Sequence, residues 1–180
     1  MSKLKYGLDI KTPIRNDRCI RTSSGIYIDV FEPTEDMITI EDIAHSLSHQ
    51  CRYGGHLPVF YSVAQHSIYC CENVEGEENK LAALMHDASE AYLLDMPRPI
   101  KYQMPEYRDI EDKLMHVIAR KFGFEYPMAK QVKEVDELAL HAEWKTFFGD
   151  RIPNDKFTGL IRTPAEVKAE FLTLFKRYKI

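Results

Sequence analysis

Residues 84–101 read LMHDASEAYLLDMPRPIK and hold a histidine, three carboxylates, an arginine and a lysine. The adjacent pair His86-Asp87 interrupts an apolar run that predicts a buried helix over 81–94. Burying an imidazole beside a carboxylate is costly unless both are bonded, and a divalent cation bound by both offsets that cost. We therefore expect a metal site on this helix, which the following prolines end.

Other acidic and imidazole side chains on this and other predicted helices are candidate ligands or catalytic groups. Glu90 shares the helix face of the pair and Asp95 follows one turn later. His66 lies on the preceding predicted helix, and Asp136 interrupts the apolar face of a later one. Each has a plainer interpretation, because a lone histidine is often a hydrogen-bonded polar residue and an aspartate often lies on a helix surface. Mixed nitrogen and oxygen donors favour a first-row divalent metal.

Cysteine is not expected in this donor set, which argues against a structural zinc site. A few protein ligands that leave coordination positions open are typical of a catalytic metal, which activates water and polarises a phosphoryl oxygen. The cysteines form no CxxC pair, and free thiols in a reducing cytoplasm are expected.

Length and composition indicate one domain over 1–180. Its expected parts are an arm, a hairpin and a first helix over 1–50, a catalytic core over 51–147, and a loop and helix over 148–180. The net charge of -4 gives no reason to expect a polymeric nucleic acid or a membrane as partner. No apolar run is long enough for a membrane span, and the N-terminus has no signal-peptide core.

The residue pattern predicts an all-α fold of about six helices with a small N-terminal β-hairpin. The hairpin is expected over 19–30, with its turn at Ser24-Gly25. The helices are expected over 39–51, 60–74, 81–94, 105–122, 128–147 and 163–178.

Two further patterns allow alternative interpretations. His45 and His49 are one helical turn apart and form either a metal pair or a core or capping histidine with an exposed neighbour. Arg52 and Tyr53 precede two glycines. They present a cation and a ring to a phosphate and a base, or they belong to a plain helix C-cap.

The chain resembles the HD-domain phosphohydrolases, most closely the bacterial 5'-deoxynucleotidases and the phage deoxyadenosine-triphosphate triphosphohydrolases. The resemblance covers roughly residues 50 to 145. An isolated His-Asp dipeptide would carry no weight, but several blocks in the order of the family are specific. The blocks are Arg52-Tyr53, AQHS over 64–67, HDASE over 86–90, DMPRPIK over 95–101 and KEVD over 133–136.

The resemblance implies a role for each matching residue. The implied metal ligands are His66, His86, Asp87 and Asp136. Glu90 matches the carboxylate that orients or deprotonates water, and Asp95 matches a second active-site carboxylate. The implied phosphate-binding cations are Arg52, Lys101 and Lys133. Tyr53 takes the aromatic position beside the sugar or base, where those relatives have Trp.

The resemblance further implies attack on the α-phosphate of a (deoxy)nucleotide, which releases a nucleoside plus phosphate or triphosphate. The expected cofactor is Zn²⁺, Co²⁺ or Mn²⁺, or Mg²⁺ with a polyphosphate substrate. A homo-oligomer (dimer or hexamer) in the cytoplasm, or in the host cytoplasm of a phage, is expected. The alternatives are a phosphodiesterase of cyclic or dinucleotides, for which His45, His49 and His56 are spare histidines, and a non-catalytic nucleotide-binding protein.

Overall fold

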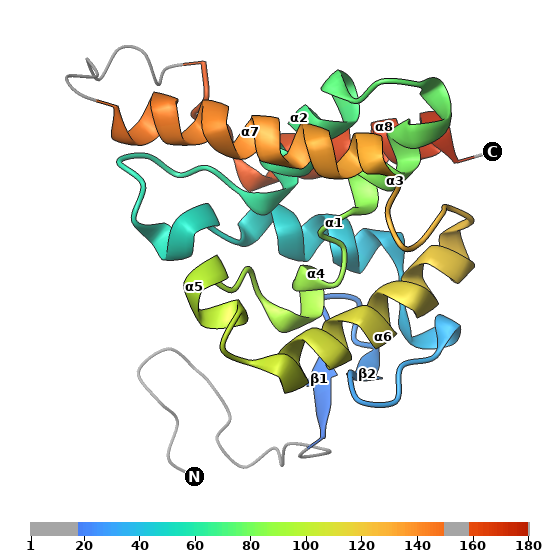
Figure 1. The fold of residues 1–180 in the computed structure, drawn as a ribbon. Helices are drawn as coiled ribbons and strands as arrows, with labels where there is room; N and C mark the ends of the chain where they lie inside the picture. The colour runs from blue at the N-terminus through green and yellow to red at the C-terminus, as the bar shows by residue number, and fades with distance from the viewer. Residues whose placement is uncertain (1–17, 150–158, 180) are drawn as a thin grey trace, which may run out of the picture.

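Helices make up most of the protein, and two short strands pair near its N-terminus (Figure 1). The computed structural model describes residues 18–149 and 159–179, so most of the expected arm and of the loop before the last helix lies outside the described residues. The predicted helical fold with a small hairpin is confirmed, and membership of the HD superfamily stays a prediction. The strands and α-helices are β1 Cys19–Arg21, β2 Tyr27–Asp29, α1 Ile40–His49, α2 Val63–Asn73, α3 Lys80–Met85, α4 Glu90–Leu93, α5 Arg98–Lys101, α6 Pro105–Phe122, α7 Lys130–Phe148 and α8 Pro164–Tyr178.

The predicted hairpin forms, and Asp42 of α1 fastens it to the helices. The strands pair antiparallel, and Ile28 is buried in the main core. The turn places Gly25 at a φ of 91°, which glycine adopts at little cost. The Asp42 carboxylate accepts hydrogen bonds from the Ser23 hydroxyl and from the backbone and hydroxyl of Ser24 at 2.6–2.8 Å. The hairpin therefore packs against α1 through both apolar and charged contacts.

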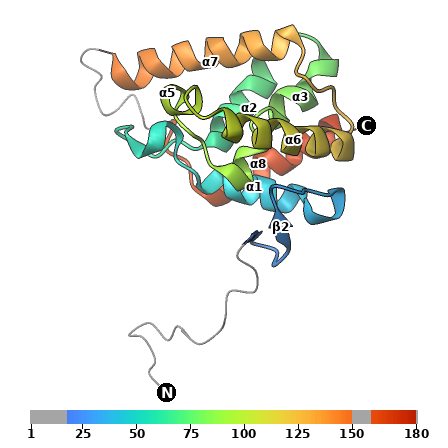
Figure 2. The same ribbon diagram turned by 60° about the horizontal axis from the view of Figure 1, so that its bottom comes forward.

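Helix α2 lies inside the bundle and contacts α1, α3, α7 and α8 (Figure 2). Ser62 begins it with a capping box, in which the Ser62 hydroxyl accepts from the Gln65 amide and the Gln65 side chain accepts from the Ser62 N–H. Val63 and Ile68 pack into the main core. His66 is thereby held on a buried helix between α3 and α7.

The prediction of one helix over 81–94 is wrong, because a turn over residues 86–89 separates α3 from α4. The Ala88 amide donates to the Met85 carbonyl, and the Glu90 amide donates to the Asp87 carbonyl, each at 3.0 Å. Backbone bonds that span three residues belong to 3₁₀ turns. His86 and Asp87 therefore lie on a turn between two short helices, and Glu90 begins the second of them.

The helix boundaries beyond this turn follow the proline and capping signals. Pro97 does not only end a helix, because the short helix α5 starts directly after it. The predicted span of α6 from Pro105 to Phe122 is confirmed. The start of α8 after Thr163 is confirmed by a capping box.

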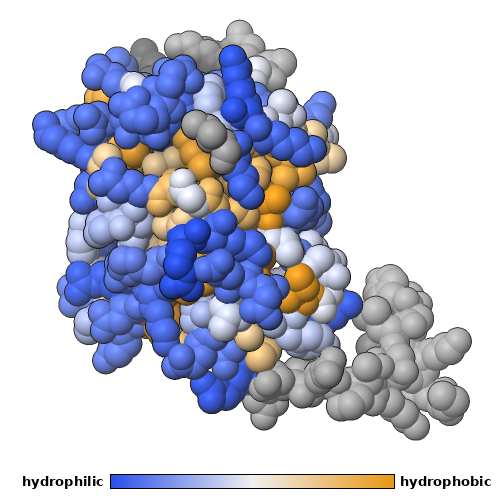
Figure 3. Space-filling view, turned by 90° about the vertical axis from the view of Figure 1, so that its right-hand side faces the viewer, coloured by the Kyte–Doolittle hydropathy of each residue, from blue (hydrophilic) through white to orange (hydrophobic). Residues whose placement is uncertain are grey.

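The surface shows hydrophilic side chains around a band of apolar ones on the face in Figure 3. Within residues 18–149 and 159–179, no helix has the length and apolar character needed to cross a membrane. All four cysteines are free, as expected from their spacing.

Candidate metal centre and adjoining cavity

Four polar side chains meet at one point, His66 from α2, His86 and Asp87 from the turn after α3, and Asp136 from α7. The Nε2 atoms of His66 and His86 are 3.2 Å apart. The Asp87 Oδ2 atom lies 3.2 Å from His86 Nε2 and 3.7 Å from His66 Nε2. The Asp136 Oδ1 atom, from α7, lies 3.1 Å from His66 Nε2 and 3.8 Å from His86 Nε2. The structure thus brings together all four residues that the sequence selected as metal ligands.

The arrangement fits one divalent cation. Nitrogen and oxygen ligands at roughly 2.0–2.2 Å from a common ion lie about 3–3.6 Å from one another. Asp87 Oδ2 is buried without a hydrogen-bond partner, which is costly for a carboxylate oxygen. Although burial opposes ionisation, the His86 ring and the Arg52 guanidinium hold the pKa of Asp87 well below its usual range. The residues therefore supply a charged oxygen donor that has no hydrogen bond, beside two imidazoles.

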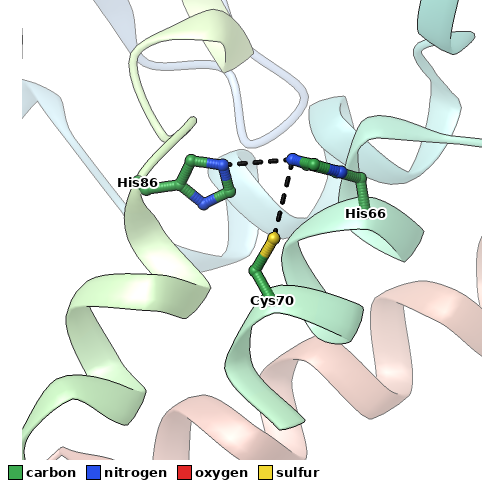
Figure 4. Close-up of side chains that lie close together, drawn as sticks. All are labelled: His66, Cys70 and His86. Atoms are coloured by element: carbon green, nitrogen blue, oxygen red, sulfur yellow. Dashed lines mark hydrogen bonds between the residues drawn. The ribbon is translucent and has the colours of Figure 1, made fainter. Parts of the chain in front are cut away.

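A cysteine also faces this point, contrary to the expectation that cysteine is outside the donor set. Figure 4 shows the Cys70 thiol, one helical turn after His66, beside the two imidazoles. Cys70 Sγ lies 3.7 Å from His66 Nε2, and the donor atoms of His66, Cys70 and His86 all lie within 4.8 Å of one another. These three residues can hold a metal ion.

Glu143 of α7 holds the His66 ring in place by a hydrogen bond. It was not among the predicted site residues. Its buried carboxylate accepts a hydrogen bond from the His66 Nδ1–H at 2.7 Å. The Tyr53 hydroxyl and Arg52 donate to its other oxygen at 3.0 and 3.2 Å. Such a bond fixes the imidazole with Nε2 toward the ion and raises its basicity as a ligand. A backbone carbonyl holds the His86 ring in the same way.

Glu143→Gln is expected to weaken metal binding by about 10–100-fold, the usual scale for partners of ligating histidines. The neutral amide keeps the shape of the side chain but no longer stabilises the His66 tautomer with a charge. The dissociation constant for Mn²⁺ or Zn²⁺, measured by competition with a chelating dye, checks this. The matched control is Glu134→Gln, an exposed carboxylate on the same helix that pairs with Lys130. Unchanged affinity in Glu143→Gln would contradict the supporting role.

The turn after α1 presents Arg52 and Tyr53 to the centre. The C-cap of α1 is Gln50, so the alternative of a plain helix C-cap at the glycine pair is wrong. Tyr53 has a φ of 55°, an uncommon backbone conformation for a non-glycine residue. The buried Arg52 lies 3.6 Å from Asp87 and 4.0 Å from Asp95. Its charge therefore faces two carboxylates of the site.

Glu90 lies beside the four donors with one carboxylate oxygen unused. The side chain is buried, and its Oε2 atom has no hydrogen-bond partner. Burial, and then the charges of Asp87 and Asp95, raise the pKa of Glu90 well above its usual range. Lys101 lies 3.2 Å from the Glu90 carboxylate and 2.7 Å from that of Glu111. Lys101 thus forms ion pairs with carboxylates, whereas the resemblance implied a phosphate as its partner.

The backbone before Asp95 is held in a strained conformation. Leu94 has φ 71° and ψ 153°, a region that only glycine adopts readily. The Tyr107 hydroxyl donates to the Leu94 carbonyl at 2.8 Å, and the Asp95 N–H donates to the Gln50 side chain at 3.2 Å. These contacts fix the Asp95 carboxyl in the site. Burial raises its pKa, against the opposing charge of Arg52.

A cavity of about 700 Å³ opens beside these residues. Its acidic wall consists of Asp87, Glu90, Asp95, Asp136 and Glu137. Three aromatic side chains also line it, and the ring of Phe148 lies 4.6 Å from that of Trp144 and 5.5 Å from that of Tyr53. The cavity is also lined by two arginines and two histidines that were not predicted to contact a substrate. They are Arg98, Arg108, His56 and His141.

Two bacterial proteins are similar to this chain. YfdR, an uncharacterized protein of Escherichia coli (strain K12), is 44% identical over 124 residues, which cover 69% of this chain and 69% of the relative. RCAP_rcc00048, an uncharacterized protein of Rhodobacter capsulatus, is 34% identical over 177 residues, which cover 84% of this chain and 90% of the relative. The chain belongs to the family of these proteins. No family model matches it.

Three residues that the sequence singled out lie apart from the cavity in this family member. The rings of His45 and His49 are 4.2 Å apart, and His49 Nδ1 is bonded to the His45 carbonyl of the same helix at 2.7 Å. Neither lines the cavity. Lys133 is exposed on α7 and does not line the cavity either. Arg98 does line the cavity and lies 3.3 Å from the second oxygen of Asp136.

Proposed function

We propose that this protein is an HD-domain phosphohydrolase that uses a divalent metal to hydrolyse (deoxy)nucleotides at the α-phosphate. The observation that carries the proposal is the meeting of His66, His86, Asp87 and Asp136 beside a carboxylate with an unused oxygen, Glu90. On a six-coordinate ion, four protein ligands leave two positions open, one for water and one for a phosphoryl oxygen. The donor set suits Zn²⁺, Co²⁺ or Mn²⁺, and Mg²⁺ when the substrate carries several phosphates.

The bound ion would lower the pKa of a water molecule and polarise the phosphoryl group. Glu90 then accepts a proton from the attacking water through its unpartnered Oε2 atom. A bond forms between the water oxygen and phosphorus, and the bond from phosphorus to the 5' oxygen of the nucleoside breaks. The leaving 5' oxygen takes up a proton from solvent, and Glu90 releases to solvent the proton that it accepted. Arg52, held by Glu143, faces the charge that develops on the phosphate.

The cavity walls suit the two ends of a nucleotide. Arg98 and Arg108 line it with guanidinium groups, which bind phosphate oxygens in a bidentate fashion. The rings of Trp144, Phe148 and Tyr53 supply apolar surface on which a base or sugar packs. A volume of about 700 Å³ lies within the range of small-molecule sites. Both a monophosphate and a triphosphate fit this description.

A substrate panel tests the proposal. The metal-loaded protein is incubated with dAMP, AMP, dATP, ATP and a cyclic dinucleotide, and nucleoside, phosphate and tripolyphosphate are quantified. We expect nucleoside together with phosphate or tripolyphosphate from at least one linear nucleotide. Cleavage of the cyclic substrate alone, with two metals per chain, would favour the phosphodiesterase. Tight nucleotide binding without any product would favour the non-catalytic alternative.

Lys101→Met is expected to move the acid limb of the kcat/KM profile to higher pH. Glu90 must be ionised to accept a proton, and the positive charge of Lys101 lowers its pKa against the effect of burial. Removing that charge raises the pKa of Glu90 further, so activity appears only at a higher pH. Lys133→Met, an exposed lysine outside the cavity, is the matched control and should leave the profile unchanged. An unmoved acid limb in Lys101→Met would contradict the assignment of that limb to Glu90.

A further inference from the structure

Cys70 is a buried nucleophilic group that the proposed reaction does not use. It lies on α2 four residues after His66, so both side chains leave the same face of the helix. The residue is 0% exposed, and its sulfur faces the point where the imidazole nitrogens of His66 and His86 meet (Figure 4). The neighbouring Cys71 packs in the main core, whereas Cys70 packs in a second apolar cluster with Val132 and Val135 of α7 and places its sulfur beside the imidazoles.

The position of the sulfur matches that of a metal ligand. A thiolate sulfur at about 2.3 Å and an imidazole nitrogen at about 2.0–2.1 Å from one tetrahedral ion lie roughly 3.6 Å apart. Cys70 Sγ lies 3.7 Å from His66 Nε2. The two histidine nitrogens are 3.2 Å apart, close to the separation that two nitrogen ligands of the same ion require. The sulfur therefore lies with the two imidazole nitrogens at one point, all within 4.8 Å of one another.

The softness of a thiolate ligand determines which metal ions bind this sulfur. Thiolates favour Zn²⁺ and softer ions, whereas Mg²⁺ and Mn²⁺ favour oxygen donors. We propose that Cys70 binds Zn²⁺, Co²⁺ or Cd²⁺ as a thiolate, in a tetrahedral site with His66, His86 and one of the two aspartates. With Mn²⁺ or Mg²⁺ the thiol stays unbound, and the ion uses the nitrogen and oxygen donors alone. Binding forms the sulfur–metal bond and releases the S–H proton to solvent. The inference rests on the proposed metal-dependent function and adds a metal-selective donor to it.

Cobalt absorption spectroscopy tests the proposal on the full chain. Co²⁺ bound at the centre gives weak visible bands, and a thiolate ligand adds an intense sulfur-to-cobalt charge-transfer band in the near ultraviolet. We expect both in the wild type, loss of the charge-transfer band in Cys70→Ala, and its retention in the matched control Cys71→Ala. The ratio of Cd²⁺ to Mn²⁺ affinity should fall by about 10-fold or more in Cys70→Ala alone.

The wild-type spectrum separates the two claims. Visible cobalt bands without charge transfer would overturn the role of Cys70 and leave the proposed function intact. No cobalt binding would overturn the metal centre itself, and the role of Cys70 with it. Charge transfer that persists in Cys70→Ala would assign the sulfur elsewhere and refute the proposal. If Cys70→Ala fails to fold, the resonance of ¹¹³Cd in the wild type decides, because a thiolate shifts it strongly downfield of a site with only nitrogen and oxygen donors.

Discussion

Asp87→Ala is expected to abolish metal binding and nucleotide hydrolysis together. The Oδ2 atom of Asp87 lies within 3.7 Å of both histidine nitrogens and has no hydrogen-bond partner. Alanine removes the negative charge that offsets the burial of a cation. A ligand that binds only the folded state stabilises it by about 4 kcal/mol at a thousand times its Kd. Chelation should therefore lower the Tm of the wild type and leave that of Asp87→Ala unchanged.

Metal content by elemental analysis and turnover of dAMP and dATP check this result. The control is Asp109→Ala, an exposed aspartate of α6 outside the cavity, which should keep both properties. Full activity of metal-stripped Asp87→Ala would refute the metal centre. Loss of activity with unchanged metal content would instead move Asp87 from the ligand set to another role.

Glu90→Gln is expected to keep the metal and lower kcat by on the order of 100-fold or more, the scale of a general acid–base group. Glu90 matches no ligand position, and its unpartnered oxygen is the one available to accept a proton from water. The amide keeps the size of the side chain but no longer accepts the proton. Single-turnover kinetics with dAMP and dATP, together with metal content, check the prediction.

The matched control for Glu90 is Glu111→Gln. Glu111 is the other carboxylate that binds Lys101, at 2.7 Å, but it does not line the cavity. Its replacement should change kcat far less than that of Glu90. If Glu90→Gln loses metal and activity at once, Glu90 is a ligand and the proton-accepting role is wrong.

Helical spacing and capping signals predicted most of the helices and the hairpin, because these depend on short-range chemistry. The capping threonine of α8, Thr163, and the proline that begins α6, Pro105, both act through contacts within a few residues. The break after α3 was missed, because it involves contacts from outside the segment. The side chains of Ser46 in α1 and of Gln50 at its C-cap donate hydrogen bonds to the backbone carbonyls of residues 91 and 90.

The sequence predicted those residues of the candidate site whose polar side chains interrupt an apolar pattern. His86 and Asp136 do so, and the structure brings them together. Cys70 and Glu143 were not predicted. In the sequence, Cys70 fits the pattern of a core residue and Glu143 that of a charged surface residue. Both carry a spacing signal. Cys70 follows His66 by one turn, and Glu143 follows Asp136 by seven residues, two turns along the same face.

Hydrolysis in ¹⁸O-labelled water tests the central claim most directly, that this site activates water to attack phosphorus. The metal-loaded wild type converts its best nucleotide substrate, and mass spectrometry locates the label in the products. The account predicts one ¹⁸O atom per turnover in phosphate or tripolyphosphate, none in the nucleoside, and no product after chelation. Label in the nucleoside, or product formation at full rate without any metal, would contradict it.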